Sequence, residues 1–484
     1  MPKRRLEDTP GMHPSNPYRD NPPDFAALAE LYPSLKPFVT IKTTGSKTQG
    51  TINFRDPMAL RELTYCLLRR DFSIELDIPI DSLCPAVPNR VNYVCWIEDL
   101  MSNNSQGSIR GIDIGTGASC IYPLLGCTRN KNWKMVATDI DDRSISYATE
   151  NVARNNLYHA VIVVKNTSSL IFPDPLFKED DERYDFCMCN PPFYEDEQDI
   201  QDSLEDKEYL PSATCQGTPN EMITAGGEVQ FVKQMIDESR QWQTRIRWYT
   251  SMLGKKDSMD KVAAYLKESK ILNYTLTTFR QGRTSRWALA WSFGDEHASW
   301  ASIQHTPKKM IKLAPPVTAL SFNVADTTLK SAVNHATAIL DRISVDYQVQ
   351  NKDSFHGGKE PRVFRGSVRT NTWSRAARRA LARKAKEQDG AADETATIER
   401  PGLSTPLAAM AFELRIFPPD DSRGPVSSSS TTASPANTLT MQMTWTVGQD
   451  RDLFESFFLH FRTNFLQRLG PSSSPSDSPI NKSV

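Results

Sequence analysis

Short apolar runs alternate with stretches of helical periodicity between about residues 109 and 293. Arg143–Asn155, Val229–Gln241 and Lys256–Lys267 carry apolar residues at helical spacing, and the runs between them are short and rich in strand formers. Strands separated by helices imply a parallel, doubly wound sheet. The pattern predicts an α/β, Rossmann-like domain with strands at Ile109–Ile114, Lys134–Thr138, Ala160–Lys165, Tyr184–Cys189, Ile246–Ser251 and, as a closing hairpin, Tyr274–Phe279 and Trp287–Phe293.

A smaller unit precedes this core. Asp24–Tyr32 reads as a helix with Asp24 as its N-cap, and Pro57 occupies the favoured first turn of a helix that runs to Arg69. Between them, 38–41 and 51–54 read as strands around a turn. We therefore expect a flexible basic arm at 1–22 and one domain at 23–300, with an accessory part at 23–105 and the core at 106–300.

The region 305–470 has a different pattern, which predicts a smaller α+β domain. Helices are expected at Thr327–Asp341 and Arg451–Leu469, with a basic helix at Trp373–Glu387. Ser/Pro/Thr-rich or aperiodic tracts interrupt it and predict disordered inserts. The expected strands are Val317–Val324, Ile343–Val349, Leu407–Phe417 and Thr438–Val447, the expected inserts are 351–372, 390–406 and 418–437, and 471–484 is an expected tail.

Composition narrows the class of protein. The chain has 484 residues and a net charge of −1, so its overall charge points to no partner. The eight cysteines form no Cys-x-x-Cys pair, and no histidines are paired at zinc spacing, so we expect reduced thiols and no metal. No stretch reaches the length of a membrane span, and the basic N-terminus lacks the apolar core of a signal peptide. A soluble, intracellular protein is expected.

The fourth predicted strand ends in Asn190-Pro191-Pro192-Phe193. Proline cannot donate to a sheet ladder, and Pro191 biases Asn190 away from helix, so the strand ends in a rigid loop. A plain proline turn would explain this motif by itself. In open α/β sheets, however, ligands bind just outside the carboxyl ends of strands, which is where Asn190 and Phe193 would stand.

A second motif, Asp113-Ile-Gly115-Thr-Gly117, follows the first predicted strand, and Asp139 ends the next. Glycines let the backbone approach a ligand, and an acidic residue at this place accepts bonds from ribose hydroxyls. The third glycine of the dinucleotide fingerprint is missing, which disfavours a pyrophosphate-bearing cofactor. A structural turn would explain the glycines alone, but the Asp139 strand and the Asn-Pro-Pro-Phe loop together indicate a nucleoside-cofactor site.

Together these motifs resemble a class I S-adenosylmethionine-dependent methyltransferase that acts on a planar nitrogen. The flanks resemble the methyltransferase-like-sixteen family, the U6 small nuclear RNA N6-adenosine methyltransferases, across about residues 16–293. Ribosomal-RNA adenine N6 methyltransferases are more distantly similar. The segments that carry the resemblance are Asn21–Phe25, Asn53–Pro57, Gly111–Gly126, Tyr184–Phe193, Arg247–Tyr249, Met252–Lys256 and Gln281–Phe293.

The resemblance implies S-adenosyl-L-methionine as cofactor and structured RNA, U6 snRNA and possible mRNA hairpins, as substrate. Asn190 and the Pro191 carbonyl would accept bonds from the target amine, and Phe193 would stack on an extruded base. The loop at Lys165 matches a family segment that can occlude the cofactor site. The implied catalytic residues are Asn190, Pro191, Pro192 and Phe193; those for the cofactor are Arg90, Asp113, Gly115, Gly117, Ser119, Asp139, Thr167 and Asn190; those for RNA are Lys3, Arg4, Arg5, Lys255, Lys256, Arg283 and Arg286.

Some expectations depart from the family or compete with it. The family has glutamate where this chain has Asp139, and the acidic stretch after Phe193, up to Glu221, is often basic in relatives; its length suggests a mobile lid. Competing functions are a ribosomal-RNA methyltransferase, a protein glutamine N5 methyltransferase and a non-catalytic RNA-binding factor. In relatives the C-terminal region resembles a kinase-associated, RNA-binding fold; a scaffold for protein partners is the alternative. We expect a monomer in the nucleus, with the cytoplasm as a second location.

Overall fold

The computed structural model describes residues 11–44, 47–102, 107–173, 176, 182–205, 217–282, 284–303, 310, 312–315, 318–350, 360–377, 379, 383, 408–418 and 438–469. They form two compact units, one within 1–294 and 298–315 and the other within 295–297 and 316–484. Each unit has its own hydrophobic core. The arms, inserts and tail predicted at 1–10, 351–359, 390–406, 419–437 and 471–484 lie outside the described residues.

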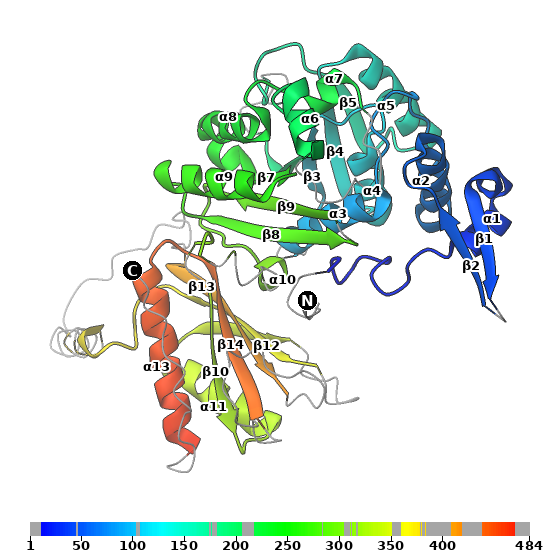
Figure 1. Cartoon of the computed structure of the whole chain (residues 1–484). Helices are drawn as coiled ribbons and strands as arrows, with labels where there is room; N and C mark the ends of the chain where they lie inside the picture. Colours follow the sequence, from blue (N-terminus) through cyan, green and yellow to red (C-terminus); the bar gives the residue numbers. More distant parts are fainter. Residues whose placement is uncertain are drawn as a thin grey trace. The chain divides into compact units, whose positions relative to one another are not determined.

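The first unit is built on a seven-stranded sheet with the order β5-β4-β3-β6-β7-β9-β8 (Figure 1). The first five strands in this order are parallel, whereas β9 runs antiparallel to both β7 and β8. The strand order reverses between β3 and β6, and such a switch point leaves a crevice at the carboxyl ends of the two strands. The predicted α/β class is confirmed. The strands are β3 (Ile109–Ile114), β4 (Trp133–Asp139), β5 (Val161–Lys165), β6 (Tyr184–Cys189), β7 (Ile246–Leu253), β8 (Tyr274–Gln281) and β9 (Thr284–Trp291).

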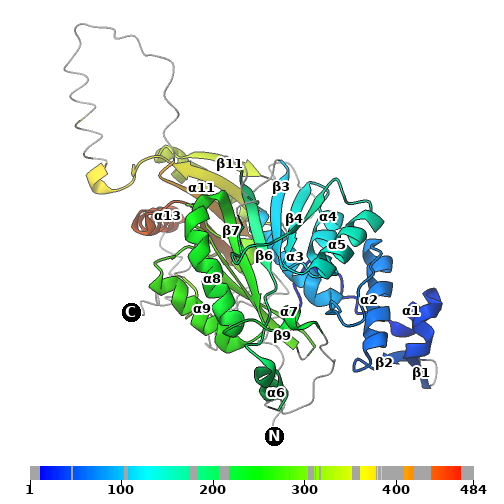
Figure 2. The same ribbon diagram turned by 90° about the horizontal axis from the view of Figure 1, so that it is seen from above.

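Helices cover both faces of this sheet (Figure 2). One face packs on α3 (Val87–Met101), α4 (Ile121–Arg129) and α5 (Asp142–Arg154), and the other on α8 (Gly227–Trp242) and α9 (Lys256–Glu268). Helix α3 was not predicted from the sequence, although its twelve buried residues make it one of the most deeply buried helices. Apolar residues lie all around it, so it lacks the one-sided pattern that marks a surface helix.

The accessory part before the core follows its local signals. Asp24 and Asp56 cap α1 (Phe25–Leu31) and α2 (Pro57–Phe72) by accepting backbone N–H bonds of the first turn. Between the two helices lie a 3-10 segment (Pro33–Phe38) and the hairpin of β1 (Val39–Thr44) and β2 (Lys47–Ile52). The predicted helices and strands are confirmed, with boundaries shifted by a few residues.

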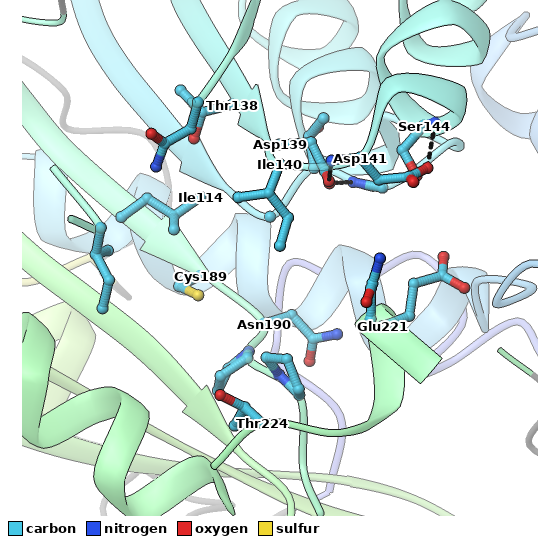
Figure 3. Close-up of a pocket in the computed structure, with 18 of the residues that line it drawn as sticks. Ile114, Thr138, Asp139, Ile140, Asp141, Ser144, Cys189, Asn190, Glu221 and Thr224 are labelled. Carbon is cyan, nitrogen blue, oxygen red and sulfur yellow. Dashed lines mark hydrogen bonds between the residues drawn. The ribbon is translucent and has the colours of Figure 1, made fainter. Parts of the chain in front are cut away.

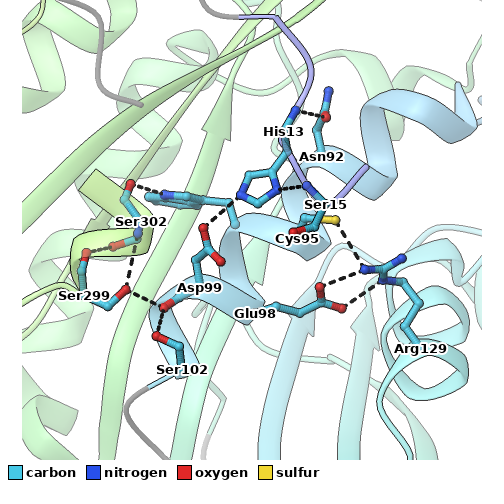
Figure 4. Close-up of polar contacts among 11 residues, drawn as sticks. His13, Ser15, Asn92, Cys95, Glu98, Asp99, Ser102, Arg129, Ser299 and Ser302 are labelled. Atoms are coloured by element: carbon cyan, nitrogen blue, oxygen red, sulfur yellow. Dashed lines mark hydrogen bonds and ion pairs between the residues drawn. The ribbon is translucent and has the colours of Figure 1, made fainter. Parts of the chain in front are cut away.

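The expectation of a flexible arm at 1–22 is wrong for residues 11–20, which form hydrogen bonds to α3 (Figure 4) and, through Tyr18, to α2. The buried His13 contacts Asp99 through Nε2 at 2.9 Å and donates its backbone N–H to Asn92. Asn16 donates to the same Asn92 oxygen at 2.7 Å, and the Tyr18 hydroxyl donates to Asp71. These partners lie more than 50 positions away along the chain, so local composition could not reveal them.

The second unit is an antiparallel five-stranded sheet with the order β10-β14-β13-β12-β11. Phenylalanines of α13 (Arg451–Leu469) and apolar residues of α11 (Leu329–Arg342) pack with the strands in one core. The irregular insert predicted at 351–372 is wrong in part, because 362–368 form a strand with partners on both sides. The strands are β10 (Ala319–Ala325), β11 (Asp346–Gln350), β12 (Arg362–Val368), β13 (Met410–Phe417) and β14 (Thr438–Val447).

Two further segments match their expected form only in part. Of the expected basic helix, residues 375–377, 379 and 383 are helical. The acidic stretch after Phe193 holds two helices, α6 (Glu197–Glu205) and the short α7 (Pro219–Met222).

Among the described residues, no helix is long and apolar enough to cross a membrane.

Candidate functional site

A cavity of about 350 Å³ lies at the carboxyl ends of β3, β4 and β6, the place that the strand order favours. Its volume is in the range of small-molecule sites. Figure 3 shows Asp139, Ile140 and Asp141 on one side of the open space and Asn190, Glu221 and Thr224 on the other. The cavity brings together residues that lie up to about 150 positions apart in the chain.

The turn after β3 presents open backbone to the cavity. Gly115 has φ of 69° and Gly117 of 61°, the left-handed region that favours glycine. A Cβ on Gly115 would meet no atom within 4 Å, so the space beside it is free for a ligand. Ser119 also lines this part of the cavity and is buried.

Asp139, at the end of β4, is held by the backbone. Its two carboxylate oxygens accept the N–H groups of Gly117 at 2.8 Å and Asp141 at 3.0 Å. Burial raises the pKa of Asp139, and these N–H bonds oppose the shift. The carboxylate therefore has a fixed place beside the glycine turn, with lone pairs left for hydroxyl donors.

Asp113 was expected among the cofactor residues, but the structure places it beneath the turn and outside the cavity lining. It accepts a bond of 2.7 Å from the Thr116 hydroxyl, and burial raises its pKa to about 7. Asp113 thus holds the turn in shape. Thr167 is likewise not in the lining, although Asn166 and Ser168 on either side of it are.

Arg90 extends from the first turn of α3 into the cavity lining and is 8% exposed. Its guanidinium carbon lies 5.6 Å from the centre of the Tyr122 ring, which orients it by a cation–π contact. Arg90 is therefore placed to bind a carboxylate within the cavity.

Asn190, Pro191 and Pro192 form the part of the lining that follows β6. The side-chain oxygen of Asn190 is buried and accepts no hydrogen bond. A buried acceptor without a partner costs free energy, so its retention in a cavity wall indicates a bond made to a ligand. Proline has no N–H, so the loop presents acceptors without competing donors.

Phe193 is not in the cavity lining and lies just past it. A Cβ on Gly254 would come within 2.9 Å of the Phe193 ring, so only glycine fits beside it. The guanidinium carbon of Arg286 lies 5.4 Å from the centre of the same ring. Phe193 is therefore held between the loop after β7 and strand β9.

Of the residues expected to bind RNA, the structure describes Lys255, Lys256 and Arg286. Lys255 contacts both oxygens of Asp199 at 2.7 and 2.9 Å, and Lys256 contacts Asp260 at 3.3 Å, so both lysines are paired with acidic neighbours. Arg286 is described above. Lys3, Arg4, Arg5 and Arg283 lie outside the described residues.

Lys165 ends β5 and contacts Asp142 at 2.5 Å, away from the cavity lining. The turn after it is closed by Asn166, which donates to the Leu170 carbonyl at 2.7 Å and accepts from Ser168. This turn supplies one wall of the cavity. Whether it can occlude the cofactor remains a prediction.

Glu221 on α7 lines the cavity and was not among the site residues predicted from the sequence. One carboxylate oxygen accepts the N–H groups of Leu83 at 3.0 Å and Thr218 at 2.8 Å, which joins two walls of the cavity. The other oxygen would lie 3.5 Å from a Cβ on Gly117. A Thr at the N-cap with Glu three positions later is a capping box, so this sequence signal could have revealed α7.

The residues of the cavity fit S-adenosylmethionine. Arg90 would bind the carboxylate of its methionine part, Asp139 the ribose hydroxyls, and the open turn at Gly115 would let the ligand approach the backbone. Glu221 and Asp139 supply negative charge that suits a ligand carrying a sulfonium. The fold and the site together define a class I methyltransferase with an Asn-Pro-Pro-Phe acceptor loop.

Comparison with known proteins shows the family. A family model described as RNA methyltransferase matches residues 6–295. RNA N(6)-adenosine-methyltransferase METTL16 of Mus musculus is 38% identical over 416 residues, 82% of this chain and 74% of that protein. The U6 small nuclear RNA (adenine-(43)-N(6))-methyltransferase of Drosophila melanogaster is 38% identical over 294 residues, 59% of this chain and 94% of that protein.

Solved structures agree with these relatives. The hMettl16 catalytic domain in complex with MAT2A 3'UTR hairpin 1 is 45% identical, with a TM-score of 0.54, and covers 59% of this chain and 96% of its own. The N-terminal domain of human METTL16 in complex with SAH is also 45% identical, with a TM-score of 0.50, and covers 59% and 100%. The chain belongs to the S-adenosylmethionine-dependent RNA N6-adenosine methyltransferases, and the resemblance and cofactor expected from the sequence are confirmed.

Proposed function

We propose that the chain methylates the N6 amine of an adenosine in an RNA hairpin, and that its substrates include U6 snRNA and mRNA hairpins. The observation that carries the proposal is the buried, unpartnered oxygen of Asn190 in the cavity wall. Relatives named for U6 snRNA and a solved complex with a MAT2A hairpin support the choice of RNA. A nuclear location, a monomeric state and the absence of a metal requirement belong to the same proposal.

The acceptor loop addresses the difficulty of the reaction. The lone pair of an exocyclic amine is delocalised into its ring and must be freed for attack on the sulfonium methyl that the bound cofactor supplies. The Asn190 side-chain oxygen and the Pro191 carbonyl would accept the two N–H bonds and favour the pyramidal, positively charged nitrogen of the transition state. No general base is needed before the methyl group transfers.

Phe193 would hold the target base in place. An adenine inside a helix cannot reach the cavity, so it must leave its stack, and an aromatic platform offsets part of that cost. Phe193 is the last residue of the acceptor loop, and its ring is fixed by the loop at Gly254 and by Arg286. Arg286 and Lys255 would then contact the RNA backbone near the flipped base.

We also propose that the second unit adds RNA affinity and no chemistry. The cavity and all its lining residues lie within the first unit. A tethered binding surface raises the effective concentration of the RNA at the cavity without adding catalytic contacts. A chain that ends near residue 300 should keep its cofactor affinity and its rate at saturating RNA, but bind RNA more weakly and with a shallower salt dependence. Equal affinity and salt slope would instead indicate a role in binding proteins.

Transfer of labelled methyl groups to a panel of RNAs tests the main proposal. The panel contains a hairpin with an unpaired adenosine, the same sequence with its stem disrupted, and the hairpin with inosine in place of that adenosine. We expect label only in the first, recovered as N6-methyladenosine. Equal labelling of the RNA with the disrupted stem would contradict the proposal that the substrate is a hairpin. If a protein is added to the reaction, label in that protein would favour a glutamine methyltransferase.

A further inference from the structure

Strands β6 and β7 separate just before the acceptor loop. The last registered pair between them is Cys187 and Tyr249, whereas β6 stays paired with β3 as far as Cys189. The N–H of Cys189 therefore has no strand partner on the β7 side. A buried N–H without a partner is costly, and a side chain takes the place of the missing strand.

That side chain is Tyr93, in the second turn of α3. Its hydroxyl oxygen accepts the Cys189 N–H at 3.4 Å and lies 2.6 Å from the hydroxyl oxygen of Thr250 on β7. Thr250 in turn donates to the carbonyl of Cys187 at 2.9 Å. Tyr93 and Thr250 are both completely buried.

The direction of each bond in this relay follows from counting protons. Thr250 has one hydroxyl hydrogen, which it donates in the hydrogen bond to the Cys187 carbonyl. In the hydrogen bond between the two hydroxyls, Tyr93 must therefore be the donor and Thr250 the acceptor. This leaves the Tyr93 oxygen as acceptor for Cys189. The relay begins and ends on β6, and burial raises the pKa of Tyr93, which keeps the hydroxyl protonated.

The Tyr93 ring is held from several sides, so its hydroxyl has one place. Tyr122 contacts it edge-on at 5.5 Å between ring centres, Trp96 is stacked at 6.2 Å, and Phe279 of β8 lies at 6.3 Å. Arg90 lies three positions earlier on the same helix, on a neighbouring part of its surface. One helix thus carries both a cavity residue and the support of the acceptor loop.

We propose that Tyr93 is a positioning residue for Asn190. By fixing the peptide group of Cys189, the relay through Tyr93 and Thr250 sets the direction in which the next residue aims its side-chain oxygen. The proposal rests on the acceptor role proposed for Asn190. An oxygen that acts only on the transition state loses its effect when it is misaimed, while ligand binding is kept.

The test is Tyr93→Phe, which keeps the ring and removes only the hydroxyl. We expect the single-turnover rate at saturating cofactor and RNA to fall at least tenfold, with both dissociation constants within twofold of wild type. Thr250→Val should have the same effect, and Thr250→Ser, which keeps the hydroxyl, should restore the rate. The double variant Tyr93→Phe/Thr250→Val should be no slower than the slower single variant, because each single substitution already interrupts the same chain of hydrogen bonds.

Tyr249→Phe is the matched control. Tyr249 is an equally buried tyrosine on β7, and its hydroxyl donates to the Gln243 carbonyl at 2.9 Å, away from the cavity. Its loss should leave the rate within twofold, and melting temperatures would show whether either variant loosens the fold. A normal rate in Tyr93→Phe, or an equal loss in Tyr249→Phe, would overturn the proposal. If Asn190→Ala itself keeps the full rate, the acceptor role fails as well.

Discussion

In the cofactor half of the cavity, both carboxylate oxygens of Asp139 accept backbone N–H groups, whereas in the acceptor half the oxygen of Asn190 accepts none. The cofactor half comprises the residues around Arg90, the Gly115–Ser119 turn and Asp139, and the acceptor half the Asn190–Phe193 loop and its surroundings. In the first half the backbone fixes the Asp139 carboxylate before any ligand binds. The second keeps its polar atom unpaired for a bond that is strongest in the transition state.

The largest expected effect is that of Asn190→Ala. Loss of one preorganised acceptor should lower the methyl-transfer rate about a hundredfold or more. RNA affinity should stay nearly unchanged, because the RNA is held mainly by contacts to its backbone. Single-turnover kinetics beside an RNA-binding titration measure this, and a rate above a tenth of wild type would remove Asn190 from its role.

A smaller loss of rate is expected from Phe193→Ala. Base–aromatic stacking contributes roughly 1 to 3 kcal/mol, so the catalytic efficiency should fall about five- to 150-fold. Phe193→Tyr keeps the stacking face and should be tolerated. An alanine variant as active as wild type would mean that Phe193 serves only as a packing residue between Gly254 and Arg286.

In the cofactor half, Glu221→Gln should weaken binding of S-adenosylmethionine. The amide can still accept the N–H groups of Leu83 and Thr218, but the negative charge beside Gly117 is lost. For a partly exposed group we expect a loss of about 1 kcal/mol, roughly fivefold in affinity. Isothermal titration measures it, with RNA affinity as the internal reference; an unchanged cofactor affinity would limit Glu221 to joining the cavity walls.

The smallest effect concerns charge in the acceptor half. Asp199→Asn should free Lys255 from its ion pair and raise RNA affinity at low salt by about two- to threefold, since exposed pairs contribute little. Asp237→Asn removes the same charge from a residue that accepts the Tyr265 hydroxyl, and serves as control. Equal gains in both variants would show a general charge effect, and no gain in either would place RNA away from Lys255.

The two halves also differ in how far the sequence predicts them. Gly115, Gly117 and Asp139 follow strands at the sheet edge where the cavity lies, so local motifs were enough to predict that they line it. Asn190 was predicted for the same reason. Tyr93, by contrast, acts through a backbone group 96 positions away, and no spacing in the sequence reveals that contact.

Similar limits explain the errors in the fold. Strands and helices with clear periodicity, such as β14 and α13, were predicted with their observed boundaries. The buried helix α3 and the segment 11–20 were missed or misjudged because tertiary contacts, and not local pattern, hold them in place. Asp113 was assigned to the cofactor because the sequence motif alone does not show whether a residue lines the cavity or lies beneath the turn.

The central claim is that the Asn190 oxygen acts as an acceptor on the target amine, and comparing two substitutions at this position tests it most directly. Asn190→Asp keeps an acceptor oxygen in the same place, whereas Asn190→Ala removes it. With cofactor and RNA hairpin both saturating, we predict that single-turnover methyl transfer is at least about tenfold faster in the aspartate variant. Equal rates in the two variants, with both ligands bound, would contradict the account.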